Sequence, residues 1–361
     1  RSMNYEYQYL GISTYYAESL STIATDLADC NADGFCAVPR VLEMMFNKLE
    51  NASKDLKGIS KTIYLWAFNL ACNYDYSKKS LFYKLQHLIA DKLVYSKWRS
   101  RLGGKEMLIV SGGSSIQEKI IRLFTAAKLY IFEGYGMTET SPVIAVNNPK
   151  EMIIKIGTVG KVVEGTEVKL AEDGEILVRG PHVMLGYYKD PDYTKEVIDS
   201  EGWFHTGDIG QFVDTIFLKI TDRKKEIFKL SAGKYIAPQI IENKIKESSY
   251  IDNCMVIGAN EKFASAIINL NKAKVEEFCN NNNILLNVET LNSNIELYNF
   301  IEKEISKINK TLAAHENIKR FRIVIDDWSP INGLLSQTLK LKRSKILEKY
   351  SSLVEEIYNL K

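Results

Sequence analysis

The stretch KEMLIVSGGSSIQEKIIRLFTAAKLYIFEGYG, residues 105–136, combines two kinds of apolar pattern. Residues 107–110 and 129–132 are short runs of large apolar residues followed by glycines, which is typical of buried strands. Between them, apolar residues recur at helical spacing over 116–126. A strand, helix and strand in this order predict two parallel strands, because the crossover connection is long enough to hold a helix. We therefore expect an α/β fold with a parallel sheet.

Both strands of this unit end in turns that contain glycine. Parallel sheets bind ligands beyond the carboxyl ends of their strands, so SGGSS (111–115) and EGYGMTET (133–140) should lie side by side at one crevice. Glycines let backbone approach a ligand, threonine hydroxyls and amides bind phosphate oxygens, and a carboxylate can hold Mg²⁺ against those oxygens. The alternative is a tight turn before a capped helix, because residues 138–141 also suit a helix N-terminus.

The segments before this unit continue the α/β pattern. Residues 35–38 are apolar and precede a proline, after which helical spacing predicts a helix over 39–49. Residues 61–101 contain neither glycine nor proline and predict a long helix with a core face and a solvated basic face. The expected core face contains Leu81, Leu85, Leu88 and Ile89. In the alternative, the basic face contacts anionic lipid.

The pattern changes in the second half of the chain. Residues 155–221 are short apolar segments separated by glycines, which predict a small, largely antiparallel β-rich subdomain. From residue 222 onward, strand-like and helical segments are mixed. We therefore expect a large N-terminal domain and a small α+β C-terminal domain joined by a hinge. Their expected ranges are 1–221, with the parallel-sheet part at 1–154, and 222–361.

The composition excludes several classes of protein. The 361 residues include 47 basic and 45 acidic side chains, so no domain-wide positive charge indicates a nucleic-acid partner. The five cysteines are scattered and lack C-x-x-C spacing, which argues against a disulfide framework and a zinc site. No apolar run reaches the roughly 20 residues that span a bilayer. A cytoplasmic protein is expected, with peripheral contact at the inner membrane surface as an open alternative.

Three further stretches carry polar side chains at turns. GWFHTGDIG (202–210) places Asp208 between two glycines, where a carboxylate can accept both hydroxyls of a ribose. DRKKEIFKLSAGKYIAP (222–238) contains Arg223 and a lysine-rich turn, and LLSQTLKLKRSKILEKY (334–350) is rich in lysine. Each has a plain explanation alone, as a turn or a solvated surface. Their occurrence together, after the glycine turns, favours one functional site.

With these stretches, the chain resembles the adenylate-forming superfamily of acyl-CoA synthetases, firefly luciferases and peptide-synthetase adenylation domains. More narrowly, it resembles the bacterial long-chain fatty-acid CoA ligases. The stretches that carry the narrower resemblance are YYAESL (15–20), AVPRVLEMMF (37–46), EGYGMTETSPVI (133–144), ITDRKKEIFKLSAGKYIAPQIIE (220–242) and QTLKLKRSKI (337–346).

The resemblance implies a two-step reaction with ATP, coenzyme A and a long-chain fatty acid as substrates and Mg²⁺ as cofactor. Thr138 and Glu139 would meet the phosphates, and Glu139 would also be the metal ligand. Lys340 would bridge the carboxylate and the α-phosphate, and Lys342, two residues away, is the alternative. A cation at that place would stabilise the negative charge that accumulates in the transition state.

The resemblance also implies a set of nucleotide- and coenzyme-binding residues. Tyr135 would pack on adenine, Asp208 and Arg223 would hold the ribose, and the turn of Lys229 and Gly233 would face coenzyme A. Asp222 occupies the hinge position. Gly112, Gly113 and Ser114 would shape the adenine and acyl pocket. The other implied cofactor-binding residues are Glu133, Gly134 and Gly136.

One departure from the family affects the expected activity. A loop rich in Ser, Thr and Gly that ends in Pro-Lys-Gly should precede these motifs, and the 361 residues contain none. We therefore expect a partial N-terminal domain and a chain that is inactive alone, whose partner is its missing N-terminal segment or a second copy. Two alternatives remain open: a ligase for an aryl or amino acid, and a non-catalytic fragment that binds nucleotide or acyl groups.

Overall fold

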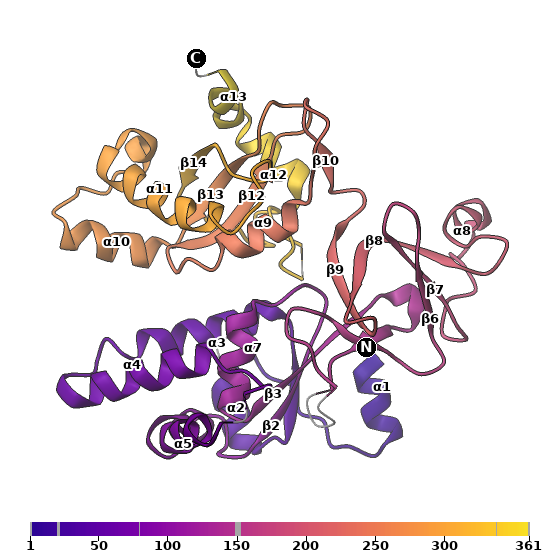
Figure 1. The fold of residues 1–361 in the computed structure, drawn as a ribbon, viewed down its shortest axis with the longest axis horizontal. Helices are drawn as coiled ribbons and strands as arrows, with labels where there is room; N and C mark the ends of the chain where they lie inside the picture. The colour runs from indigo at the N-terminus through magenta and orange to yellow at the C-terminus, as the bar shows by residue number, and fades with distance from the viewer. Residues whose placement is uncertain (1, 20–21, 79, 149–152, 337, 360–361) are drawn as a thin grey trace. The chain divides into compact units, whose positions relative to one another are not determined.

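The structure is a computed structural model that describes residues 2–19, 22–78, 80–148, 153–336 and 338–359. The chain forms two compact units, and Figure 1 colours it by residue number. The first unit consists of Arg1–Glu172, Ile176–Thr206 and Gln211–Ile220. The second consists of Asp173–Glu175, Gly207–Gly210 and Thr221–Lys361. This mixed α/β architecture, with a large sheet and a smaller C-terminal part, confirms the expected fold class.

The expected parallel strands form one end of the large sheet in the first unit. They are β1 (Gly34–Ala37), β2 (Met107–Ser111) and β3 (Leu129–Gly136), with β2 between the other two. Helix α3 (Pro39–Asn51) follows β1, and α7 (Glu118–Ala126) connects β2 to β3. Helix α7 buries Ile120, Leu123 and Phe124 because its apolar residues lie on one face. The strand–helix–strand prediction from residues 105–136 is therefore confirmed.

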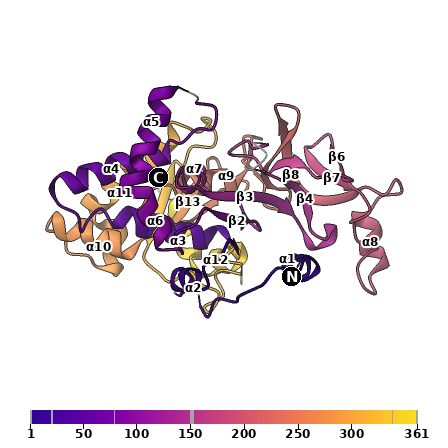
Figure 2. The same ribbon diagram turned by 90° about the horizontal axis from the view of Figure 1, so that it is seen from below.

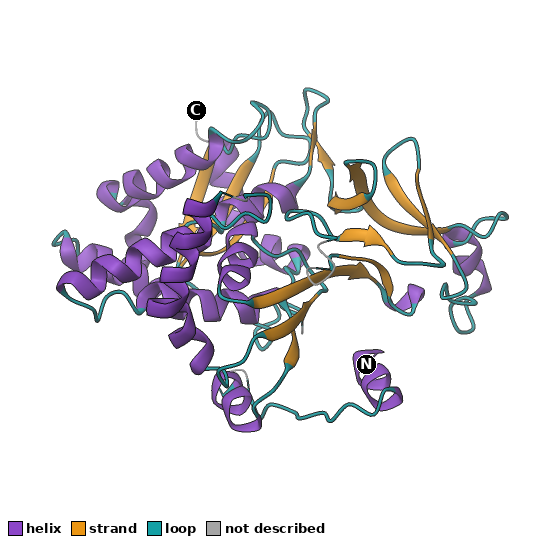
Figure 3. Ribbon diagram, turned by 60° about the horizontal axis from the view of Figure 1, so that its bottom comes forward, coloured by secondary structure: helices purple, strands orange, loops and turns teal. Residues whose placement is uncertain are grey.

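The antiparallel strands continue the same sheet rather than forming a separate one, because β4 pairs with β3. The sheet order is β1-β2-β3-β4-β5-β9-β8-β7-β6, and Figure 3 shows its strands in orange. The added strands are β4 (Val143–Val146), β5 (Gly160–Val162), β6 (Glu167–Leu170), β7 (Glu175–Arg179), β8 (Phe204–Val213) and β9 (Phe217–Arg223). Helices α1 (Ser2–Tyr9), α2 (Ile23–Cys30) and α8 (Pro191–Val197) belong to the same unit.

The long helix expected over 61–101 is wrong in two respects. The segment is divided into α4 (Gly58–Cys72), α5 (Leu81–Ala90), a π-helical turn (Asp91–Tyr95) and α6 (Ser96–Ser100). The four aliphatic residues expected in the core instead face solvent, with exposed fractions of 85% for Leu81, 52% for Leu85, 69% for Leu88 and 43% for Ile89.

Aromatic rings on the opposite side of α5 decide which face is buried. The ring centroids of Tyr83 and His87 lie 4.5 Å apart, and those of Tyr95 and Trp98 lie 5.1 Å apart. Tyr95, in the π-helical turn, and Trp98, in α6, are both buried. Figure 2 shows α5 projecting beyond α4 and α6 of the same unit.

The second unit is built on a three-stranded sheet. Strand β13 (Ser265–Leu270) pairs antiparallel with β12 (Ile251–Ile257) and parallel with β14 (Arg320–Val324). A two-stranded hairpin of β10 (Phe228–Lys229) and β11 (Tyr235–Ile236) precedes them. The helices are α9 (Pro238–Ile245), α10 (Lys272–Asn281), α11 (Ile295–Asn309), α12 (Arg343–Lys349) and α13 (Ser351–Asn359). All of β13 is buried, so the core lies around this central strand.

Candidate functional site

The two glycine turns of the first unit lie side by side, as predicted. In the register of β2 and β3, Ser111 is opposite Glu133 at the carboxyl ends of the strands. A Cβ atom on Gly112 would lie 3.5 Å from the Gly134 carbonyl oxygen, so the two backbones are close. Gly113 has a φ of +88° and is exposed with Ser114, which turns the chain away from β2. These strand ends therefore form one polar edge of the sheet.

Two buried polar atoms at this edge have no hydrogen-bond partner among the described residues: the Ser111 hydroxyl oxygen and Glu133 Oε2. Glu133 is only 7% exposed. Burial raises the pKa of its carboxyl to about 8, although a hydrogen bond from the Ile116 backbone opposes this shift. At neutral pH the carboxyl is therefore protonated, and it has an O–H group to donate. Unpaired buried polar atoms are rare in native proteins and indicate an absent ligand or water.

The buried carboxyl predicts a pH dependence of stability. Below the unfolded pKa near 4.5 both states are protonated; above it, the native state alone retains the proton until about pH 8. Stability should therefore fall as pH rises through this window, by about 1.4 kcal/mol per pH unit. Glu133→Gln has no group that titrates here, so it should not lose this stability. Its free energy of unfolding, taken as the difference from wild type, should therefore be about 2 kcal/mol more favourable at pH 8 than at pH 6. Urea denaturation at the two pH values measures this, and the exposed Glu172→Gln is the control. The prediction would be wrong if the free energies of unfolding of Glu133→Gln and wild type differed by the same amount at both pH values.

The turn after β3 is closed by its own backbone and by Thr140. The Met137 amide donates to the Pro142 carbonyl over 3.0 Å. The Thr140 hydroxyl contacts the Met137 and Pro142 carbonyls at 3.1 and 2.6 Å, and Thr140 is fully buried. A three-residue 3-10 helix (Thr138–Thr140) forms before β4, and the Met137 amide at its start donates to the Thr140 hydroxyl over 3.2 Å, so the turn also has the short capped helical start of the alternative interpretation. Thr138 remains exposed at the crest of the turn.

Gly136 leaves no room for a side chain. A Cβ atom there would lie 1.8 Å from the Pro142 carbonyl oxygen, which itself accepts the two bonds that close the turn. Gly136→Ala should therefore destabilise the first unit by about 1–3 kcal/mol, the usual cost of overpacking. Gly112→Ala is the matched control, because its Cβ would make only an ordinary contact at 3.5 Å. Thermal unfolding compares the two; equal melting temperatures would show that the turn adjusts freely.

Glu139 is held by a tyrosine that the sequence analysis missed. The Tyr187 hydroxyl donates to Glu139 Oε1 over 3.0 Å, and the Met184 amide donates to the Glu139 carbonyl over 2.7 Å. Burial, followed by the hydrogen bond and charge of Glu139, raises the pKa of Tyr187 to about 12. Its ring stacks on Tyr193 with centroids 4.9 Å apart. Tyr187 therefore orients the carboxylate from a segment 48 residues away.

In the second unit, Asp208 and Arg223 form an ion pair. Arg223 Nε lies 3.3 Å from Asp208 Oδ1, with Asp208 buried and Arg223 nearly half exposed. Their strands are tied together by the Lys224 amide, which donates to the Gly207 carbonyl over 2.8 Å. A buried carboxylate paired with a partly exposed guanidinium presents both acceptors and donors at one place.

Lys340 belongs to the same group of charges. Burial lowers the pKa of its ammonium group, the Arg223 cation lowers it further, and Asp208 and Glu226 act in the opposite direction. A short hairpin positions it, because the Ser336 amide donates to the Lys340 carbonyl over 2.8 Å and the Lys340 amide donates to the Ser336 hydroxyl over 3.0 Å. Lys342 is exposed, whereas Lys340 is half-buried.

Arg343 fixes the lysine segment to the rest of the second unit. Its guanidinium donates to both oxygens of Glu242, at 2.9 and 2.8 Å, and its Nε lies 3.0 Å from Glu226 Oε2. Glu242 is 5% exposed and also accepts the Val256 amide over 2.7 Å. Burial raises the pKa of Glu242 and the Arg343 cation opposes this. No local sequence pattern indicated any of the three side chains of this network.

Asp222, the expected hinge residue, is fully buried and connects to the same network. Its Oδ2 accepts the Gln239 amide at the N-terminus of α9 over 3.0 Å, and its Oδ1 accepts the Arg223 amide over 2.6 Å. The Gln239 side chain in turn donates to Glu226 over 3.1 Å. Burial raises the pKa of Asp222 to about 6, against the two amide bonds. One helix end therefore holds both the hinge position and the partner of Arg343.

Two further predicted residues are exposed: Lys229 is the last residue of β10, and Gly233 lies on the turn between β10 and β11. Gly233 has a φ of +82° and its amide donates to the Leu230 carbonyl over 2.8 Å. Lys229 is exposed, with its Nζ 5.5 Å from the centre of the Tyr235 ring.

The described residues contain no group of three or more His, Cys, Asp or Glu side chains that could hold a metal ion. Glu139 offers a single oriented carboxylate. This fits Mg²⁺, which proteins usually bind through one or two carboxylates together with substrate phosphates. In the parts of the chain that the structure describes, no helix is long and apolar enough to cross a membrane.

Both parts of the chain match models of one enzyme family. The model described as AMP-binding enzyme matches residues 9–188, and the model described as AMP-binding enzyme C-terminal domain matches residues 225–361. The chain therefore belongs to the AMP-binding enzyme family.

Individual relatives place the chain within this family. It is similar to the long-chain-fatty-acid–CoA ligase FadD15 of Mycobacterium bovis, with 35% identity over 90% of this chain and 54% of the relative. The adenylation domain of a carboxylate reductase from Mycobacterium chelonae has a similar fold, with a TM-score of 0.71 and 21% identity over 96% of this chain and 50% of that one. An O-succinylbenzoate coenzyme A synthetase from Bacillus subtilis, in complex with ATP and magnesium ion, has a TM-score of 0.57 at 18% identity over 89% and 54% of the two chains. The chain thus spans about half the length of these proteins.

Proposed function

We propose that this chain is part of an enzyme that activates a long-chain fatty acid with ATP and transfers the acyl group to coenzyme A. The 35% identity to a long-chain-fatty-acid–CoA ligase supports the substrate class. The structural observation that carries the proposal is the pair of unpartnered buried atoms, Ser111 Oγ and Glu133 Oε2, beside the glycine turns. They supply hydrogen-bonding capacity at the sheet edge where α/β folds bind ligands.

The proposed reaction has two steps. In the first, a carboxylate oxygen of the fatty acid bonds to the α-phosphorus of ATP, the bond from that phosphorus to the bridging oxygen breaks, and pyrophosphate leaves. In the second, the sulfur of coenzyme A bonds to the acyl carbon, AMP leaves with the electron pair of the broken C–O bond, and the thiol proton goes to solvent.

The strand ends are proposed to hold the nucleotide. The neutral Glu133 carboxyl and the Ser111 hydroxyl would exchange hydrogen bonds with adenine, and Tyr135 would pack on the ring. Asp208, with Arg223 beside it, would accept the ribose hydroxyls. The residues that would let the nucleotide approach the backbone are Gly112, Gly113, Ser114, Gly134 and Gly136.

Thr138 and Glu139 are proposed to meet the phosphates. The exposed Thr138 hydroxyl would donate to a phosphate oxygen, and Glu139 would hold Mg²⁺, which neutralises phosphate charge when bound. Tyr187 would keep Glu139 in one rotamer, since its hydroxyl occupies one carboxylate oxygen.

Lys340 is proposed to act in the first step, which brings two anions together. Its ammonium group would lie between the fatty-acid carboxylate and the α-phosphate and stabilise the charge in the transition state, an effect worth about 3 kcal/mol for one such group. Asp222 would be the hinge about which the second unit rotates, and the turn of Lys229 and Gly233 would then face coenzyme A.

A second candidate is a non-catalytic fragment that binds nucleotide or acyl groups, because the sequence lacks a loop ending in Pro-Lys-Gly. Calorimetric titration of the chain with AMP and with dodecanoyl-, benzoyl- and aminoacyl-adenylate analogues tests both. We expect weak binding that favours the dodecanoyl analogue and is lost in Asp208→Ala, together with no acyl-CoA formation by the chain alone. Tight binding of AMP would support the second candidate. A preference for the benzoyl or aminoacyl analogue would overturn the fatty-acid assignment.

A further inference from the structure

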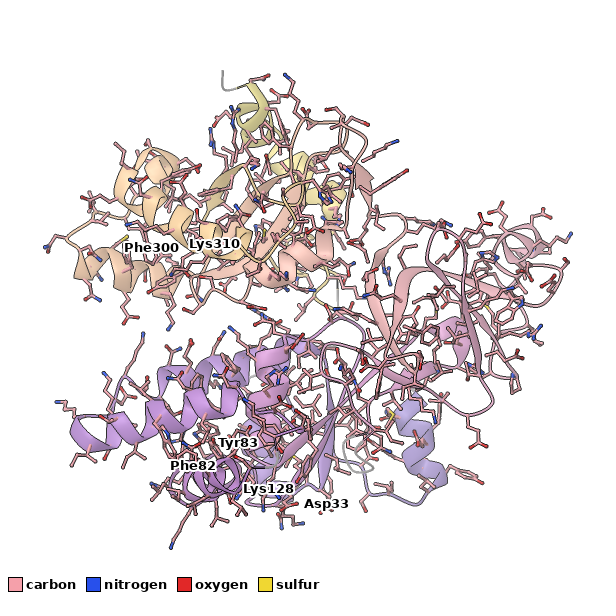
Figure 4. The ribbon with its side chains drawn as sticks, in the orientation of Figure 1. Asp33, Phe82, Tyr83, Lys128, Phe300 and Lys310 are labelled. Carbon is pink, nitrogen blue, oxygen red and sulfur yellow. The ribbon has the colours of Figure 1, made fainter. Side chains whose placement is uncertain are left out.

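The exposed face of α5 is apolar, and no other part of the chain that the structure describes covers it. Its large apolar side chains recur within each turn along residues 81–93, and their exposed fractions lie between 41% and 85%. We call this set the α5 stripe; it consists of Leu81, Phe82, Leu85, Leu88 and Ile89 of α5 and Leu93 of the π-helical turn that follows it. The opposite face packs through the aromatic cluster around Tyr83, so the helix is apolar on both sides. Figure 4 marks Phe82 and Tyr83 on this helix.

The stripe is large enough to lie flat on another surface. From Leu81 to Leu93 a helix rises about 18 Å at 1.5 Å per residue. Singly exposed apolar residues are ordinary on proteins, but a contiguous row of six on one helix face marks an interaction site.

The charge around the stripe identifies its partner as an anionic surface. Residues 76–101 contain seven basic side chains and one acidic side chain, Asp91. Both oxygens of Asp91 are engaged by Arg99, at 2.5 and 3.2 Å, so this carboxylate is already neutralised within the fold. Lys84 and Lys92 are exposed on the same helical segment, next to the apolar side chains.

We infer that the α5 stripe binds the surface of a membrane that contains anionic phospholipid. Its side chains are aliphatic apart from one phenyl ring and carry no hydrogen-bonding group to fix a protein partner in one orientation. A helix of this kind enters the interface with its apolar face among the acyl chains and its lysines at the headgroups. The inference stands independently of the proposed reaction.

Vesicle sedimentation of the 361-residue chain tests the inference. The chain should bind vesicles that contain phosphatidylserine more strongly than vesicles of phosphatidylcholine alone. The double variant Leu85→Ser/Leu88→Ser should lower partition by at least about tenfold, because apolar area no longer leaves water. Lys84→Gln/Lys92→Gln should lose the preference for anionic vesicles and its dependence on salt. The control is Leu285→Ser/Ile331→Ser, which removes two apolar side chains of the second unit that are even more exposed, at 86% and 97%.

Two further measurements make the outcome decisive. In Leu88→Trp, the tryptophan emission should shift to shorter wavelength on addition of anionic vesicles, which reports entry into the acyl region. Analytical ultracentrifugation without lipid tests a second copy as the occupant. A dimer that the double serine variant dissociates, with no difference in vesicle binding, would overturn the inference. Equal partition of wild type and the double serine variant would also overturn it. Unchanged circular dichroism shows that the variants fold.

Discussion

Arg343→Met is expected to destabilise the second unit by about 3–5 kcal/mol, because it leaves the buried Glu242 carboxylate without its counter-charge. Glu242 is 5% exposed and receives two of its hydrogen bonds from this guanidinium. The Val256 amide, which donates to the same carboxylate, lies on the buried strand β12. Hydrogen exchange at Val256 therefore measures the effect, and its protection should fall by about two to four orders of magnitude, which corresponds to about 3–5 kcal/mol.

Two further variants separate this network from a general loss of charge. Lys345→Met removes a cation from the same helix, but its partner Glu348 is 71% exposed, so the change should cost less than about 1 kcal/mol. Adding Glu242→Gln to Arg343→Met should restore part of the stability, because no charge then remains buried alone. If Lys345→Met lowers Val256 protection as much as Arg343→Met does, the Glu242 pair has no special role.

Lys340→Ala is expected to lower formation of the acyl-adenylate on the order of 10²–10³-fold, the usual loss when one group that stabilises transition-state charge is removed. The measurement is fatty-acid-dependent exchange of pyrophosphate into ATP, in a protein that carries these residues together with a phosphate-binding loop. Calorimetry on the chain itself gives a second readout, since the variant should also bind the dodecanoyl-adenylate analogue more weakly. The reaction of preformed adenylate with coenzyme A should change little, since two anions are no longer brought together.

Lys342→Ala is the matched control for this experiment. Lys342 is exposed on the same short segment, so its removal should change adenylate formation less than about threefold, as for a screened surface charge. The lowered pKa of Lys340 adds a pH test, because the cation is lost at a lower pH than for an ordinary lysine. Wild-type exchange should therefore decline on the alkaline side, whereas Lys340→Ala should lack this decline. A larger loss in Lys342→Ala would transfer the role to that residue.

The sequence predicted the elements whose signals are local. The strands and glycine turns of 105–136 were recognisable because apolar runs, helical spacing and glycines lie within one unit. The side-by-side placement of the two glycine turns followed from the geometry of parallel strands, and the register that puts Ser111 opposite Glu133 confirms it.

The errors and omissions have a common physical origin. Helix α5 has apolar residues on both faces, so periodicity could not decide which face is buried; the aromatic contacts decide it. Arg343 meets Glu226 and Glu242 across 117 and 101 residues, and no local pattern signals such contacts. Tyr187 was missed for the same reason, although its place beside a second tyrosine after a glycine was a weak signal.

The second unit is not contiguous in the chain, and this determines where the polypeptide can be divided. Asp173–Glu175 and Gly207–Gly210 belong to it, and Lys224 pairs with Asp173 at 2.6 Å and with the buried Glu175 at 2.8 Å. A polypeptide that starts at residue 221 would lose these carboxylates and also Asp208, the partner of Arg223. Separate expression of the C-terminal part would therefore yield a piece with uncompensated cations along its first strand. A chimera that takes its C-terminal part from a relative should therefore also take Asp173–Glu175 and Gly207–Gly210 from that relative.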